Sequence, residues 1–64
     1  MGKSLFVMKT MTITMDNERE AVALAGFFND CGITSSSKGK DVKATGDPEV
    51  ISYLYGKFVT IALL

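Results

Sequence analysis

Apolar and polar residues alternate near the start of the chain. From Lys9 onward, Met11, Ile13 and Met15 are separated by single threonines. A period of two, with several β-branched residues, is typical of a strand that buries one face. Because the residues just before Lys9 are also apolar, the predicted strand runs from Leu5 to Met15 and exposes its threonines on the other face.

The pattern then changes to helical spacing. Asn17, followed three residues later by Glu20, is a capping-box pattern that predicts a helix start. Gly32 suits the left-handed position that ends a helix, with Ile33 folding back onto the last turn. We therefore expect a helix from about Glu18 to Cys31. Its inward side would carry Ala21, Leu24, Ala25, Phe27, Phe28 and Cys31.

Two short segments, ITSSS and DVKAT, follow as a predicted hairpin. A two-residue turn at Lys38 and Gly39 would place Ile33 opposite Ala44. It would likewise place Ser35 opposite Val42. The stretch SSSKGKD resembles a phosphate-holding loop, but the tight turn by itself explains the glycine. We interpret it as a hairpin tip with solvated lysines.

A second helix is predicted after the hairpin. Asp47 is its N-cap, Pro48 its first residue and Gly56 its stop. The remaining residues, KFVTIALL, keep helical spacing with Ile51 and Leu54, yet they are rich in β-branched and aromatic types. Because glycine costs a helix interior about 1 kcal/mol relative to alanine, we favour a fourth strand over a continued helix.

The predicted order is β-α-β-β-α-β, which is the ferredoxin-like split-βαβ plait. This fold has a four-stranded antiparallel sheet, in the order four, one, three, two, with both helices on one face. The alternative is β-α-β-β-α with a long C-terminal helix. The face under the helices would carry Met11, Ile13, Val42, Ala44, Val59 and Ile61, and the open face Thr10, Thr12, Thr14, Thr34, Ser36, Lys43, Thr45 and Thr60.

The length of 64 residues allows a single domain, residues 1–64, with a thin core. We interpret residues 1–7 as an N-terminal extension or an expression remnant, with the strand from Leu5 as the alternative. Domains of this size usually need additional support. Because Cys31 is the only cysteine and the chain has no histidine, neither a disulfide nor a metal can supply it, and we expect a homo-oligomer.

The charge balance argues against nucleic acid and membranes as partners. Seven basic and seven acidic residues give a net charge of zero, so no global field attracts polyanions. RNA-binding domains of this topology stack bases on aromatic residues of their central strands, where this chain has threonines and a lysine. Phe58 is the only aromatic candidate. The apolar LFVM stretch is too short to span a bilayer, and a lone cysteine fits the cytoplasm.

The sequence also lacks the residues expected of a catalytic site. The chain has no histidine, and its carboxylates fall at predicted helix ends and turns, where capping explains them. Cys31 would lie at a helix C-terminus, where the dipole disfavours a thiolate, and we expect it to be a small core residue. We predict no enzyme activity and no cofactor.

Four cations would gather at one end of the predicted domain, near the start of the first helix: Lys38, Lys40, Lys57 and Arg19. A helix N-terminus attracts anions, but three carboxylates, Asp16, Glu18 and Glu20, occupy the same end. We predict that these cations contact an acidic protein partner rather than a phosphate.

The run ITMDNEREAVALAGFFNDCGI, about a third of the chain, resembles the start of ACT-type regulatory domains. These domains share the predicted topology and bind amino acids at dimer interfaces. They usually carry an Asp-x-x-Gly-like turn before the helix, whereas this chain has Asp16-Asn17-Glu18-Arg19. No ligand-binding residues are therefore transferred. The resemblance implies an alternative function as a dimeric sensor of an amino acid or another metabolite.

The predicted fourth strand would be an apolar edge with none of the usual protection by lysine, proline or a bulge. Together with the overhanging start of the first strand, it predicts pairing between chains. The predicted oligomer interface comprises Leu5, Phe6, Val7, Phe58, Val59, Thr60, Ile61 and Leu63. The sequence thus favours a small non-enzymatic interaction module that self-associates and binds a partner protein, such as the inhibitors or adaptors that phages and mobile elements encode.

Overall fold

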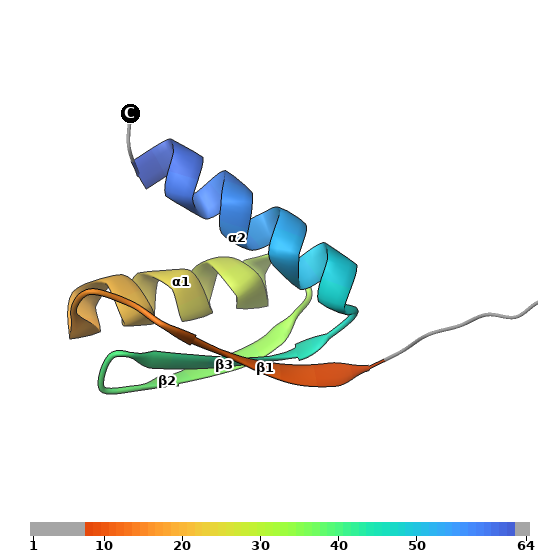
Figure 1. Cartoon of the computed structure of the whole chain (residues 1–64), viewed down its shortest axis with the longest axis horizontal. Helices are drawn as coiled ribbons and strands as arrows, with labels where there is room; N and C mark the ends of the chain where they lie inside the picture. Colours follow the sequence, from red (N-terminus) through yellow and green to blue (C-terminus); the bar gives the residue numbers. More distant parts are fainter. Residues whose placement is uncertain (1–7, 63–64) are drawn as a thin grey trace, which may run out of the picture.

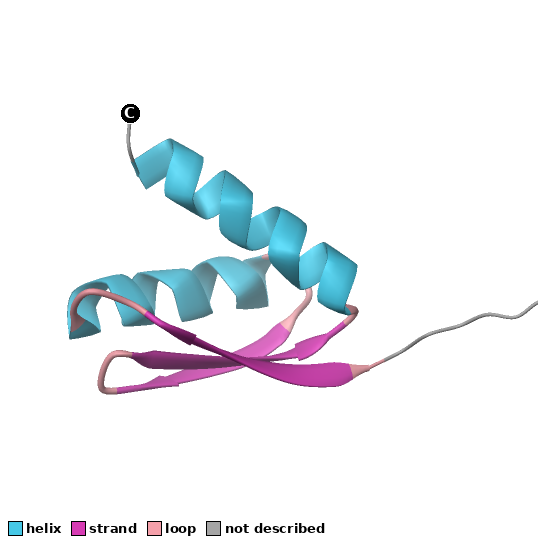
Figure 2. Ribbon diagram, viewed as in Figure 1, coloured by secondary structure: helices cyan, strands magenta, loops and turns pink. Residues whose placement is uncertain are grey.

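The computed structural model describes residues 8–62 and shows an α+β domain with two helices packed on one face of a three-stranded antiparallel sheet (Figures 1 and 2). The elements follow in the order β1 (Lys9–Thr14), α1 (Glu18–Asp30), β2 (Thr34–Lys38), β3 (Asp41–Gly46) and α2 (Pro48–Ala62). The strand order is β1-β3-β2, so β3 is central and the other two strands form the edges.

The expected caps of α1 are confirmed. The Asn17 side chain accepts a hydrogen bond from the backbone N–H of Glu20 at 2.9 Å. At the other end, Gly32 has a φ of +89°, and the N–H of Ile33 donates to the carbonyl of Phe28 at 2.8 Å. This is the Schellman arrangement, which turns the chain and buries Ile33.

The predicted fourth strand is wrong, because α2 continues through Gly56 to Ala62. The ferredoxin-like plait is therefore not formed, and the element order is that of the alternative with a long C-terminal helix. Asp47 caps α2 as expected, accepting from the N–H of Glu49 at 2.9 Å. Phe58 then packs against Phe27 with ring centroids 5.7 Å apart, a contact that offsets the cost of glycine inside the helix.

The predicted hairpin register is also wrong, by two residues. Ser35 lies opposite Ala44 rather than Val42, and Lys38 pairs with Asp41 across a turn formed by Gly39 and Lys40. Gly39 has a φ of +60°, whereas no non-glycine residue described has a positive φ. Glycine thus takes the first central position of a type II′ turn. A type I′ turn at the predicted position, Lys38 and Gly39, would have required the left-handed conformation at Lys38. A shift of two residues leaves the faces of the strands unchanged.

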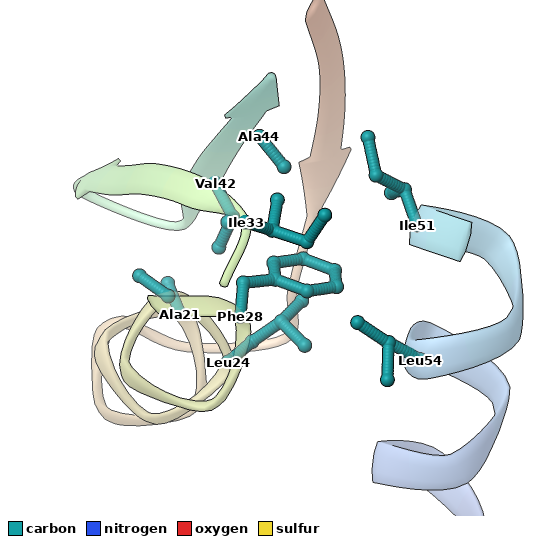
Figure 3. Packing of buried hydrophobic residues seen from close by; sticks show 9 residues of the cluster. Ala21, Leu24, Phe28, Ile33, Val42, Ala44, Ile51 and Leu54 are labelled. Carbon is teal, nitrogen blue, oxygen red and sulfur yellow. The ribbon is translucent and has the colours of Figure 1, made fainter. Parts of the chain in front are cut away.

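The core lies between α1, the sheet and the first half of α2 (Figure 3). Its largest fully buried side chains are Phe28, Leu24, Ile51 and Val42. The predicted core position of Cys31 is wrong: its side chain is exposed because the chain turns there and Ile33 takes the inward position. Val59 and Ile61, expected beneath the helices, belong to α2 instead, and only Val59 is half-buried.

Candidate functional site

The free edge of β1 exposes the backbone of three threonines. Met15 donates its N–H to the carbonyl of Lys40 at 2.8 Å, so these two residues form a hydrogen-bonded pair that continues the β1–β3 register. Residues of an antiparallel pair alternate between hydrogen-bonded and non-hydrogen-bonded positions. With the observed register, Ile13 and Met11 therefore bond to β3 as well. The N–H and C=O groups of Thr10, Thr12 and Thr14 point away from the sheet.

The free edge of β2 is covered within the chain. The same alternation directs the backbone of Ser35 outward, and there the Asn29 side chain satisfies both of its groups. The Asn29 amide donates to the Ser35 carbonyl at 3.1 Å and accepts from the Ser35 N–H at 3.0 Å. The Ser35 hydroxyl also donates to the carbonyl of Ala25 at 2.6 Å. This edge is closed at its centre by α1.

An apolar groove adjoins the C-terminal end of β1. Its volume is about 300 Å³, and it is lined by Thr14, Met15, Asp16, Glu20, Tyr55, Phe58, Val59 and Ala62. One wall is therefore the β1–α1 connection, and the other is the second half of α2. The apolar side chains form most of the lining, with the two carboxylates at the start of α1.

The groove exists because α2 packs closely only in its first half. Ile51 and Leu54 are buried, whereas Phe58 and Val59 are only half-buried. Figure 1 shows α2 rising away from the sheet toward its C-terminus. On the strand side, Met11 and Ile13 face the helices and are also only half-buried. The open edge of β1 and this incompletely covered apolar face lie next to each other.

The structure brings three of the four predicted partner-binding cations to one end of the domain. Lys38 and Lys40 are exposed at the β2–β3 turn, which lies at the same end as the start of α1, where Arg19 is exposed (Figure 1). Lys57 is placed differently: it lies in the middle of α2, with its Nζ 5.5 Å from the ring centroid of Tyr53. Helical spacing puts Lys57 on the side of α2 opposite the groove.

The predicted interface residues are helical where they are described. Phe58 and Val59 line the groove, Ile61 is exposed, and the Thr60 hydroxyl donates to the carbonyl of Gly56 at 2.9 Å. Leu5, Phe6, Val7 and Leu63 lie outside the described residues. Sequence reasoning assigned the unprotected edge to the last segment and missed the edge of β1. The signal was present in the alternating threonines, because the stretch from Thr10 to Thr14 contains no lysine, proline or bulge.

The open face of the sheet is covered by hydroxyl groups. The side chains of Thr10 and Thr45 are hydrogen-bonded at 2.9 Å, and the Thr14 hydroxyl donates to Asp41 at 2.8 Å. Phe58, the one aromatic candidate for base stacking, lies on α2 and not on this face. Within residues 8–62, no group of three or more histidine, cysteine or acidic side chains is placed to hold a metal. No helix in that range has the length and hydropathy needed to span a bilayer.

Comparison with known proteins assigns the chain to no family, because no protein family, curated protein or solved structure matches it significantly. The resemblance to ACT-type domains gains no support from these comparisons. The geometry of the β1 edge and the groove therefore has to carry the functional argument.

Proposed function

We propose that this protein is a non-enzymatic interaction module of the cytoplasm that self-associates and binds protein by strand addition at the edge of β1. The observation that carries this proposal is the run of outward backbone groups on Thr10, Thr12 and Thr14 beside an apolar groove. An added strand would complete the hydrogen bonding of this edge.

The two parts of the site would contribute in different ways. Main-chain hydrogen bonds to an exposed sheet edge give strand addition its affinity, and neighbouring pockets for side chains give its specificity. Burying the half-exposed apolar surface of Met11, Ile13 and Phe58 would add roughly 25 cal/mol for each Å² removed from water. A strand with apolar side chains at alternate positions fits both requirements.

Proline at the edge tests strand addition directly. In Thr12→Pro, the ring replaces an N–H that points away from β3, so the variant blocks the edge without breaking the β1–β3 ladder. Ser37→Pro is the matched control, because Ser37 also directs its N–H outward, on the edge of β2. Both variants should keep the far-ultraviolet circular dichroism of the wild type.

The binding assay compares the three proteins as bait, with captured proteins quantified by mass spectrometry. We expect at least one protein, including further copies of this chain, to bind wild type and Ser37→Pro but not Thr12→Pro. Equal capture by all three baits would contradict the proposal. Native mass spectrometry of the purified chain checks the sensor alternative, since a stoichiometric bound metabolite would favour it instead.

A further inference from the structure

We infer that the β1 edge is occupied by β1 of a second copy of this chain, in an antiparallel pair whose two-fold axis passes through Thr12. This inference rests on the proposed function and names the partner. Because Thr10, Thr12 and Thr14 are the residues that face outward, two copies form hydrogen bonds only if such residues lie opposite one another. Centring the pair on Thr12 satisfies this condition for all three, with Thr10 opposite Thr14 of the second copy.

The same register matches the apolar faces. Met11 lies opposite Ile13 of the second copy, at a non-hydrogen-bonded position where side chains approach most closely. A two-fold axis perpendicular to the sheet keeps the helices of both copies on one side. Met11 and Ile13 of each copy therefore cover the half-buried face beneath α2 of the other, in the place where a fourth strand would lie.

The same pairing brings the start of β1 of the second copy to the groove. Antiparallel pairing around Thr12 places Lys9 of the second copy opposite Met15, which lines the groove. Because Met11, Ile13 and Met15 pack toward the core, residues of odd number in β1 face the helices, and Lys9 of the second copy lies on the same side of the sheet as the groove. The chain's own Lys9 is at the opposite end of β1, about 20 Å from Met15 at roughly 3.3 Å per residue.

Charge complementarity favours the same arrangement. The groove carries the carboxylates of Asp16 and Glu20 beside Met15. In the two-fold pair, the ammonium group of Lys9 of the second copy comes to this end of the groove, and the symmetric contact repeats the interaction. A partner strand with an acidic residue at this position would instead meet two like charges.

Sedimentation equilibrium of the full chain tests the inference. The wild type and Ser37→Pro should be dimeric, and Thr12→Pro should be monomeric over the same concentrations. Val59→Lys should weaken the dimer because Val59 lines the groove, whereas Ile61→Lys, its control on the exposed side of α2, should not.

Each outcome separates the inference from the proposed function. A monomeric wild type overturns the inference, but a captured protein that Thr12→Pro fails to bind would leave strand addition standing. A dimer that survives Thr12→Pro places self-association on another surface and also overturns the inference. Loss of the dimer in Thr12→Pro, with no effect of Val59→Lys, refutes the groove contact. Loss of the dimer in both variants supports the arrangement.

Discussion

The two edges of the sheet have similar sequences and opposite environments. β1 reads KTMTIT and β2 reads TSSSK, and both present hydroxyl side chains on the open face. On β2, the Asn29 amide closes the outward backbone groups of Ser35 within the chain. On β1, the equivalent groups of Thr12 face outward beside a groove that α2 leaves open.

This difference shows that an edge is protected by what packs beside it as much as by its own residues. α1 lies along β2, and its last turn carries an amide that imitates a neighbouring strand. α2 begins beside β3 but rises from the sheet, so its second half offers apolar side chains without satisfying any backbone group of β1 (Figure 2). An edge whose backbone groups are already hydrogen-bonded cannot pair with a strand of another chain, whereas an edge with free backbone groups can.

The largest expected effect comes from a substitution on the closed side of the molecule, where α1 covers the sheet. Phe28 is fully buried between α1 and the sheet, so Phe28→Ala should lower the free energy of unfolding by about 3–5 kcal/mol. Phe58→Ala, on the open side, should cost less than half as much because Phe58 is only half-buried. Urea denaturation of both variants measures the contrast. Similar losses would mean that α2 packs as firmly as α1.

Removing the amide that closes β2 should make the two edges alike. Asn29→Ala deletes both hydrogen bonds to Ser35, with an expected loss of about 1–2 kcal/mol in stability. The Ser35 amide should then exchange with solvent much faster in hydrogen-exchange measurements by nuclear magnetic resonance. Asp30→Ala, at the next and exposed position, is the control. Unchanged exchange at Ser35 would show that the amide does not protect this edge.

Replacing the glycine inside α2 tests whether the helix above the open edge of β1 is continuous. Among residues 8–62, a Cβ at Gly56 would meet no atom within 4 Å other than those of the adjacent residues and of the helix backbone around it, so Gly56→Ala should stabilise the helix and the protein by about 1 kcal/mol. A higher midpoint of thermal unfolding is the expected readout. If the helix instead ended at Gly56 in the left-handed conformation, alanine there would destabilise the protein.

The smallest effect is expected at the hairpin tip. Lys38 and Lys40 are exposed, and the turn depends on Gly39, so replacing both lysines with alanine should change stability by less than about 0.5 kcal/mol. The same double variant tests whether these cations contact an acidic partner, because binding would weaken while the melting temperature stays constant. A large loss of stability would show that the lysines support the fold itself.

Local sequence determined the elements whose signals lie within a few residues of one another. The capping residues Asn17 and Asp47, the stop at Gly32 and the alternation along β1 each produced the predicted structure, because the groups that interact are close along the chain. These features also decided which side of each strand of the sheet faces the helices.

Tertiary structure decided the last segment, the hairpin register and the functional edge. The residues after Gly56 suit a strand or a helix locally, and contacts such as that between Phe58 and Phe27 select the helix. The edge of β1 became the candidate site only because that helix removed the fourth strand that would have covered it. Asn29 closes the edge of β2 by hydrogen-bonding to Ser35, six positions further along the chain, and this contact depends on how α1 lies against β2. Local propensities differ by about 1 kcal/mol, so packing between distant segments outweighs them.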